Sequence, residues 1–343
     1  MQKLKVASNE AGQRLDKLLS KYLSQAGKGF LYKMMRKKNI TLNGKKCDGS
    51  ERVEEGDEIS LFLADETIEK FSAPLPELAA LGKEKDRNSG KAGKNGENGN
   101  RKKKQELSIV YEDKNVLIVN KPSGMLSQKA KEGDVSLNEH ILNYLIDSGH
   151  LPVSQLRTFR PSICNRLDRN TSGLVVAGTS LAGLQIMNGV LKDRSIHKYY
   201  QCIVKGKIDK PQMIAGFLKK DEAQNTVQIY PLEVEGSVPI MTEYVPVKSS
   251  DTATLLRVTL ITGRSHQIRA HLASIGHPIV GDPKYGDKLI NQTAQKKYRI
   301  RSQMLHSWQV VFPQLPEPLA YLSGKSFLAP LPAEFSRICK EWK

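Results

Sequence analysis

The stretch with the strongest chemical signature in this sequence is Asn-Arg-Leu-Asp-Arg-Asn-Thr-Ser-Gly at residues 165–173. Asp168 lies between Arg166 and Arg169, and guanidinium groups at close range favour the ionised form of a carboxyl group. A turn-forming Asn-Thr-Ser-Gly follows, and the apolar run 174–177 after it predicts a buried strand. A rigid turn and strand would hold the ionised Asp168 in a fixed position, which is what a catalytic nucleophile or base requires. The residues alone also fit a structural ion pair that caps a turn.

A second candidate lies in the stretch 194–204, whose alternation and β-forming residues predict a strand. Lys198-Tyr199-Tyr200 places two tyrosines side by side, and neighbours on a strand point to opposite faces of a sheet. One tyrosine is therefore expected to face a cleft and the other to pack or be exposed. A core tyrosine is the alternative for either ring.

A third candidate is Thr-Gly-Arg-Ser-His-Gln-Ile-Arg at residues 262–269. It joins a strand predicted over 254–261 to a helix that Ser265 would cap and Gly276 would end. Arg269 lies on a different helix face from the apolar stripe, so near the core it would need a partner. That stripe consists of Ile268, Leu272 and Ile275.

Taken in this order, the three stretches resemble the RluA-type pseudouridine synthases, over roughly residues 106 to 343. The segment Arg166-Leu167-Asp168-x-x-Thr171-Ser172-Gly173-Leu174 is similar to the catalytic motif of that family. Many members carry His where this chain has Asn165, and Asn also fits the pattern. Asn120-Lys121-Pro122-Ser123-Gly124 resembles the segment that edges the active-site cleft in the family.

The resemblance implies a role for each candidate. Asp168 would be the catalytic residue, and Arg269 would hold and polarise it. Tyr200 would stack on the target base and help to move the proton at C5, since an aromatic face suits a flipped base. Arg166 would contact the RNA, and Arg264 would contact either a phosphate of the RNA or the turn in which it lies. The implied fold is α+β, with a mixed, largely antiparallel sheet and a central cleft, which agrees with the absence of regular strand-helix alternation.

Composition points to a polyanionic partner. Lys and Arg number 53 against 36 Asp and Glu, giving a net charge of +17 in 343 residues. Such a charge favours RNA or an acidic membrane surface. No apolar run approaches a membrane span, and the first residues lack the apolar centre of a signal peptide. We therefore expect a cytoplasmic, monomeric protein that acts on RNA and not at a membrane.

Histidine and cysteine spacing does not indicate a metal site. His266 and His271 are off a common helix face, so hydrogen bonding is expected of them. The cysteines form no Cys-x-x-Cys pair and fit free thiols of a reducing compartment. No metal or other cofactor is expected, because the implied reaction is an isomerisation without a redox step. The four cysteines are Cys47, Cys164, Cys202 and Cys339.

Residues 1–64 form a compact basic unit with a small α+β pattern. Leu15, Leu18, Leu19, Tyr22 and Leu23 give one helix an apolar face, and a short basic helix is predicted over 30–38. Asn43-Gly44 is a strong hairpin signal, and residues 59–63 predict a closing strand. The order resembles the αL-type RNA-binding module that often precedes RluA-type catalytic domains. Its expected phosphate contacts are Lys33, Arg36, Lys37, Lys38, Lys45 and Lys46.

Residues 65–105 read as a flexible basic linker that ends in Arg101-Lys102-Lys103-Lys104, and residues 106–343 as the catalytic domain. A tether of this kind would let the first domain hold RNA while the second searches for its uridine. The predicted function is conversion of uridines, in large-subunit ribosomal RNA, to pseudouridine. A transfer-RNA pseudouridine synthase and a non-catalytic RNA-binding or ribosome-assembly protein remain alternatives.

Overall fold

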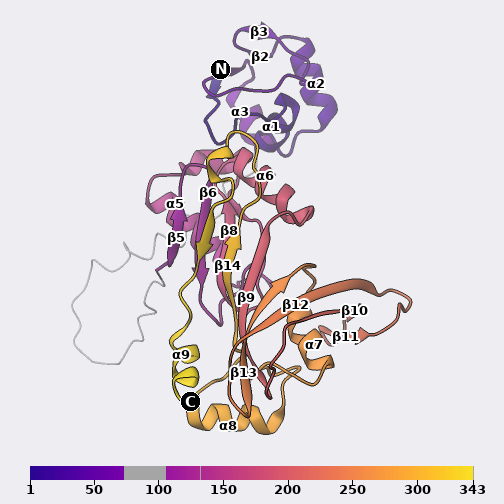
Figure 1. Ribbon diagram of the computed structural model, residues 1–343. Helices are drawn as coiled ribbons and strands as arrows, with labels where there is room; N and C mark the ends of the chain where they lie inside the picture. Colours follow the sequence, from indigo (N-terminus) through magenta and orange to yellow (C-terminus); the bar gives the residue numbers. More distant parts are fainter. Residues whose placement is uncertain (73–105, 132, 343) are drawn as a thin grey trace, which may run out of the picture. The chain divides into compact units, whose positions relative to one another are not determined.

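The protein is described by a computed structural model that covers residues 1–72, 106–131 and 133–342 (Figure 1). Its contacts divide the chain into two compact units. The first gathers Met1–Leu107, Glu139–Ser162 and Gly178–Leu184, and the second gathers Ser108–Asn138, Ile163–Ala177 and Gln185–Lys343. Each unit carries its own sheet. Within the described residues, no helix is long and apolar enough to cross a membrane.

The first unit is built on a four-stranded antiparallel sheet in the order β1-β4-β2-β3. The apolar face predicted for the first helix is buried against the core of this unit. The hairpin predicted at Asn43-Gly44 is confirmed, since both residues have the positive φ, 51° and 71°, that its tight turn requires. The elements are β1 (Gln2–Lys5), α1 (Leu15–Tyr22), α2 (Lys28–Arg36), β2 (Ile40–Leu42), β3 (Lys45–Lys46), β4 (Glu58–Leu61) and α3 (Asp65–Phe71).

Helix α3 lies where the sequence analysis begins the linker. Its Ile68 is 4% exposed and packs into the same core as α1 and α2. The apolar residues of Asp65–Phe71 therefore belong to the first unit. Residues 73–105 lie outside the described part of the chain, so the flexible linker and its basic run at 101–104 stay predictions.

Segments from much later in the chain complete the first unit. The Thr158 hydroxyl donates to a carboxylate oxygen of Glu10, which is 6% exposed. The Asn9 side-chain amide donates to Gln155 over 2.7 Å, and the Asn9 backbone carbonyl accepts from the backbone N–H of Leu181 over 3.0 Å. Polar groups near the N-terminus thus find partners beyond residue 150. These later elements are η2 (Val153–Arg157), most of α5 (Leu137–Asp147) and the start of α6 (Leu181–Lys192).

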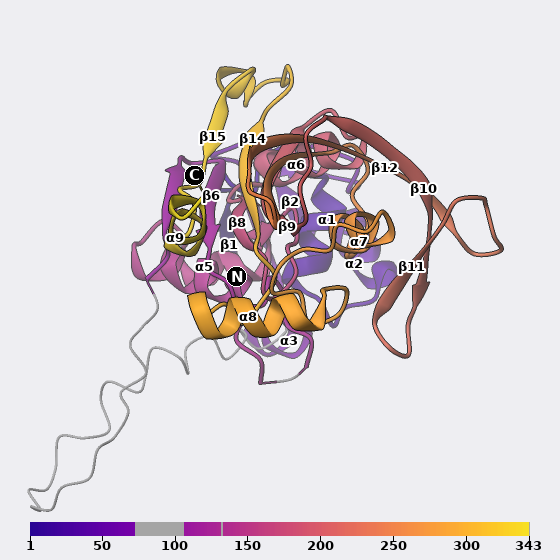
Figure 2. The same ribbon diagram turned by 60° about the horizontal axis from the view of Figure 1, so that its bottom comes forward.

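The second unit holds an 11-stranded sheet in the order β11-β10-β12-β13-β9-β14-β8-β6-β5, with β15 on β14 and β7 on β8. β8 and β14 are parallel, whereas β9, β10, β12 and β13 pair antiparallel. The β10–β11 hairpin lies at the right of the view in Figure 2. The fold is therefore α+β with a mixed, largely antiparallel sheet, as predicted. The strands are β5 (Ile109–Glu112), β6 (Val116–Lys121), β7 (Ser162–Ile163), β8 (Ser172–Gly178), β9 (His197–Lys205), β10 (Gln212–Asp221), β11 (Thr226–Tyr230), β12 (Val238–Ser249), β13 (Ala253–Leu260), β14 (Leu305–Val311) and β15 (Ser326–Leu328).

The starts of α6 and α7 are held by different side chains. The Ser180 hydroxyl accepts from the N–H of Gly183 over 3.0 Å and caps α6. Ser265 does not cap α7, because the helix begins after His266, which has a left-handed φ of 55°. The Gln267 side chain holds this turn instead, accepting from the Thr262 hydroxyl over 2.9 Å. The remaining helices are α7 (Gln267–Ser274), α8 (Lys288–Tyr298), η3 (Ala320–Leu322) and α9 (Ala333–Lys340).

Candidate active site

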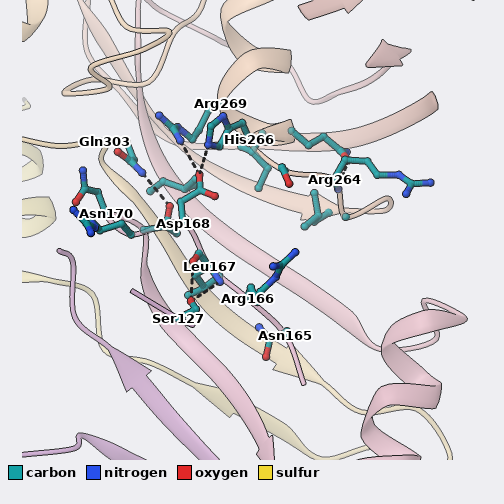
Figure 3. Close-up of a pocket in the computed structure, with 18 of the residues that line it drawn as sticks. Ser127, Asn165, Arg166, Leu167, Asp168, Asn170, Arg264, His266, Arg269 and Gln303 are labelled. Atoms are coloured by element: carbon teal, nitrogen blue, oxygen red, sulfur yellow. Dashed lines mark hydrogen bonds and ion pairs between the residues drawn. The ribbon is translucent and has the colours of Figure 1, made fainter. Parts of the chain in front are cut away.

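Asp168 lies on the loop that leads into β8, and hydrogen bonds fix the backbone on both sides of it (Figure 3). The Ser127 hydroxyl donates to the Leu167 carbonyl over 2.7 Å and accepts from its N–H over 3.0 Å. Asn165 accepts from the N–H of Val176 over 2.8 Å, which ties the start of the loop to β8. The Asp168 carbonyl accepts from the N–H of Thr171 over 3.0 Å. The loop is thus held in one conformation.

Lys121, at the end of β6, is hydrogen-bonded to the same loop through its side chain. Its side chain is fully buried, and Nζ donates to the carbonyls of Pro122, Met125 and Arg169 over 3.0, 2.8 and 3.0 Å. Burial lowers the pKa of Lys121 to about 7, against the opposing effect of the Asp168 charge. The sequence placed this lysine in a motif at the cleft edge but did not identify its role.

Arg269 holds Asp168 and a second carboxylate together. Nη1 donates to Oδ2 of Asp168 over 2.7 Å, while Nε and Nη2 form a two-pronged pair with Asp282 over 2.7 and 2.9 Å. The side chains of Arg269 and Asp282 are 5% and 0% exposed, against 28% for Asp168. Burial would lower the pKa of Arg269, but its bonds to Asp282 and the charges of both carboxylates raise it above its ordinary value. The guanidinium therefore stays charged.

The two carboxylate oxygens of Asp168 have different surroundings. Oδ2 faces Arg269 at 2.7 Å and Nε2 of His266 at 3.9 Å (Figure 3). Within the described residues no hydrogen bond or ion pair engages Oδ1. The side chain lines the pocket, so Oδ1 is the oxygen left for a bound molecule. The ion-pair partner is Arg269 from α7, and no ion pair with the flanking Arg166 or Arg169 is found among the described residues.

Tyr200, on β9, lines the same pocket as Asp168 and is 6% exposed. Burial raises the pKa of Tyr200 to about 12, although a hydrogen bond to Ser307 acts in the opposite direction. The side chain is therefore a neutral phenol at physiological pH. The neighbouring Tyr199 is half-buried and does not line the pocket, in line with the opposite faces predicted for the pair.

The pocket has a volume of about 860 Å³ and belongs entirely to the second unit. The structure brings Asp168, Tyr200 and Arg269 to its wall, together with Arg166 and Arg264. Basic and polar side chains that the sequence analysis assigned no role also line it: Lys198, Lys220, Asn225, Lys284 and Gln303. The basic residues predicted for the first unit do not line it; they are exposed on α2, on β3 and in the turn after α2.

Asp282 and Tyr285 are site residues that sequence reasoning missed. Both lie in Gly-Asp-Pro-Lys-Tyr-Gly, a turn-rich loop at residues 281–286, and the signal was an acid and an aromatic in a turn that follows the Arg269 helix. Asp282 accepts from Arg269, and the guanidinium carbon of Arg269 lies 5.2 Å from the centre of the Tyr285 ring. Tyr285 thus covers the ion pair with an aromatic face.

Comparison with known proteins connects this site to one family. The sequence profile described as RNA pseudouridylate synthase matches residues 115–274, a range that contains Asp168, Tyr200 and Arg269. The chain is 29% identical over 296 residues to ribosomal large subunit pseudouridine synthase C of Salmonella typhi, covering 84% of this chain and 80% of that protein. It is 28% identical over 339 residues to ribosomal large subunit pseudouridine synthase D of Nitrosomonas europaea, covering 98% and 86%.

Two solved human structures share the fold. RNA pseudouridylate synthase domain-containing protein 1 aligns with a TM-score of 0.51 and 22% identity, over 69% of this chain and 96% of that one. Domain-containing protein 4 of the same name aligns with a TM-score of 0.53 and 21% identity, over 67% and 90%. The likeness covers most of both human chains.

Proposed function

Because the chain belongs to the RNA pseudouridylate synthase family, we propose that it isomerises specific uridines of large-subunit ribosomal RNA to pseudouridine. The observation that supports this most is Asp168, which lines the pocket with Oδ2 held by the buried Arg269 and with no partner for Oδ1 among the described residues. The names of the relatives support large-subunit ribosomal RNA as the substrate. Work on that RNA would place the protein in the cytoplasm.

The reaction exchanges one bond to the ribose for another. The bond between C1′ and N1 breaks, the detached base turns, and a bond between C1′ and C5 forms; C5 loses its proton and N1 gains one. Two roles fit Oδ1 of Asp168. As a nucleophile it would attack C1′, and as a base it would remove a ribose proton. Arg269 would hold and polarise the carboxylate in either role.

Tyr200 is suited to hold the base while it is detached. Its phenol is neutral, so its ring can stack on an uncharged pyrimidine that has left the RNA stack. Its hydroxyl is a group that could help to move the proton at C5. Extruding a uridine costs about a few kcal/mol, and cationic pocket residues such as Arg166 and Arg264 would offset that cost by binding the flanking phosphates.

The first unit would supply sequence-independent affinity for the RNA. Its basic residues are exposed, and an exposed cluster of lysine and arginine binds phosphates by releasing counterions. The cluster consists of Lys33, Arg36, Lys37, Lys38, Lys45 and Lys46.

Tritium release from RNA labelled at C5 of uridine tests the proposal. Wild-type protein should release tritium from ribosomal RNA, while Asp168→Asn should release none and bind the same RNA within a few-fold. Asp193→Asn removes a carboxylate whose hydrogen bonds, within the described residues, all come from the nearby Ser195, and it should behave as wild type. Release by Asp168→Asn would disprove the role of Asp168. Release from transfer RNA alone would show that transfer RNA is the substrate. Binding of RNA without any release of tritium would favour a non-catalytic ribosome-assembly protein.

Deuterium at C2′ of the uridine would separate the two roles of Asp168. A base that removes this ribose proton gives a primary isotope effect on the single-turnover rate, whereas attack at C1′ breaks no bond to that hydrogen. The same wild-type protein and RNA serve both arms, so the ratio of the two rates needs no further variant.

A further inference from the structure

A chain of polar contacts leads from β11 to the catalytic carboxylate. The backbone N–H of Val227 donates to the Tyr285 hydroxyl over 2.8 Å, and this hydroxyl lies 2.9 Å from Nδ1 of His266. On the far side of the same ring, Nε2 lies 3.9 Å from Oδ2 of Asp168. Neither His266 nor Tyr285 has a role in the reaction as described so far.

The number of available protons determines which group donates in the hydrogen bond between Tyr285 and His266. The Tyr285 hydroxyl has one proton to donate, and it already accepts from Val227. If His266 donated as well, the phenol proton would have no partner among the described residues. If the phenol donates to Nδ1, the phenol proton and Nδ1 both have a partner, and the ring proton of a neutral His266 must then sit on Nε2, which lies 3.9 Å from Oδ2 of Asp168.

The charges around His266 also favour its neutral form. Burial is the main effect that lowers the pKa of His266, with Arg269 and Lys284 acting in the same direction and Asp168 and Asp282 opposing them. Burial raises the pKa of Tyr285, so its phenol keeps the proton that it donates. The ring of His266 meets that of Tyr285 edge-on, with centroids 5.7 Å apart.

We infer that Tyr285 and His266 are positioning residues for Asp168, a role that rests on the proposed uridine isomerisation. Tyr285 fixes the orientation and tautomer of His266, and the Nε2–H of His266 then directs its positive end at Oδ2 of Asp168. The 3.9 Å gap exceeds a hydrogen bond, and such contacts commonly tighten only when substrate is bound. With Arg269, this arrangement presents two donors to Oδ2 and leaves Oδ1 as the reactive oxygen.

The arrangement also connects the β10–β11 hairpin to the carboxylate. Lys220 and Asn225 of this hairpin line the pocket, and Nζ of Lys284 donates to the Asn225 carbonyl over 2.6 Å. Tyr285 follows Lys284 directly and contacts the start of β11 through Val227. A molecule that contacts the hairpin would therefore act on Tyr285, and through Tyr285 and His266 on the position of Asp168.

Nitrogen NMR of histidine-labelled full-length protein tests the tautomer directly. In wild type, the His266 signal, assigned by its loss in His266→Gln, should show a bare Nδ1 and a protonated Nε2. In Tyr285→Phe the tautomers should mix, and the midpoint of His266 titration should rise by about half to one pH unit, because the bond that favours the neutral ring is gone. Unchanged tautomer and midpoint in Tyr285→Phe would overturn the inference.

Kinetics supply the second readout. Tyr285→Phe should lower kcat for pseudouridine formation about tenfold while KM for ribosomal RNA stays within twofold. Tyr230→Phe is the matched control, since it removes a β11 phenol whose one hydrogen bond among the described residues goes to Gln228, outside the pocket, and it should keep wild-type values. In a His266→Gln background, Tyr285→Phe should cause no further loss, and a full tenfold loss there would show that Tyr285 does not act through His266.

The two proposals fail in different ways. A wild-type protein that forms no pseudouridine on any RNA would disprove the proposed function. It would also disprove a role in catalysis for the contacts from Tyr285 through His266 to Asp168, called the relay below. The NMR comparison would still show whether Tyr285 sets the tautomer of His266. Turnover by wild type with an unaltered His266 signal in Tyr285→Phe would refute the relay alone.

Discussion

Arg269 lies between the fully buried carboxylate of Asp282 and the partly exposed carboxylate of Asp168, and the two contact different nitrogens of its guanidinium group. Asp282 engages Nε and Nη2 as a fixed fork, which orients the guanidinium plane. The remaining Nη1 then points to Asp168 at the pocket wall. Asp282 is thus the group that aims the cation, although it does not line the pocket.

Replacing Asp282 with Ala should therefore affect stability and turnover together. The change leaves a buried guanidinium without its fork partner, and breaking a buried pair costs about 3–5 kcal/mol. Urea unfolding at pH 7 should show this loss, and kcat should fall with it. Asp209→Ala breaks an exposed pair with Lys207 and should cost less than about 1 kcal/mol. Equal losses in the two variants would contradict the orienting role.

Buried histidine should make stability depend on pH. Burial lowers the pKa of His306 from 6.5 to about 4, and its Nδ1 lies 2.8 Å from the Ser172 hydroxyl. The unfolded chain takes up the proton first, so stability present above pH 6.5 is lost as pH falls toward 4. The loss is on the order of 3 kcal/mol for this one group.

The difference between wild type and His306→Asn isolates that contribution. Urea unfolding at pH 7.5, 5.5 and 4.5 should show a smaller loss in the variant, because Asn does not titrate in this range. His271 is a further buried histidine whose pKa is lowered to about 4 by burial, and it remains in both proteins as a constant background. Parallel curves for the two proteins would show that His306 does not bind a proton on unfolding.

The sequence indicated which residues line the pocket better than it indicated their contacts. Asp168, Tyr200 and Arg269 were predicted from three separate stretches, and all three line one pocket. The partner of Arg269 was predicted as Asp168 alone. Asp282 was missed because a contact between a helix residue and a later turn depends on tertiary packing, which spacing along the chain does not encode.

At the scale of elements, β8 joins the loop that carries Asp168 to the sheet through a close approach to β14. Gly173 has a φ of 112°, and a Cβ built on it would lie 2.2 Å from the backbone oxygen of Ser307 on β14. These two residues are opposite each other in the parallel pair. A side chain at 173 would separate the strands next to the loop that carries Asp168.

Gly173→Ala should therefore prevent the native pairing of β8 and β14. We expect little folded protein, or a loss of several kcal/mol in urea unfolding, since both the backbone conformation and the space exclude Cβ. Gly189→Ala is the control: nothing lies within 4 Å of its Cβ, and it sits inside α6. That change should be neutral or stabilise by up to about 1 kcal/mol. A well-folded Gly173→Ala would refute the steric argument.

Elements with an uninterrupted apolar pattern were predicted, and those with a broken pattern were not. The buried run of β8 and the apolar stripe of α1 both appear in the structure. No element was predicted from the sequence for the stretch that forms β10, β11 and β12. In β10 the buried positions are Ile214, Gly216 and Leu218, and the central glycine weakens the alternation that marks a strand.

At the scale of the whole molecule, the charge of +17 has a testable consequence for RNA binding. Changing Lys33, Arg36 and Lys37 together to Gln should weaken binding of ribosomal RNA and reduce the slope of log affinity against log salt by about 0.7 for each phosphate that is no longer neutralised. The value of kcat at saturating RNA should stay as in wild type, because none of the three lines the pocket.

Lys3→Gln supplies the comparison for that experiment. Lys3 belongs to the same unit, but its Nζ already lies 2.9 Å from Glu58, so it should change the salt slope little. Filter binding at four salt concentrations measures both variants. A triple variant with the wild-type slope would remove the predicted cluster from the RNA interface.

The first unit has a consequence for the chain as it leaves the ribosome. Its apolar core comes from residues up to Phe71, but buried Glu10 meets Thr158, and Asn9 meets Gln155 and Leu181. At typical synthesis rates those partners emerge roughly five to twenty seconds after the core. During that interval the nascent unit has its hydrophobic core but lacks the hydrogen bonds of Glu10 and Asn9 to the later segments. The unit can therefore complete its fold only after those segments have been translated.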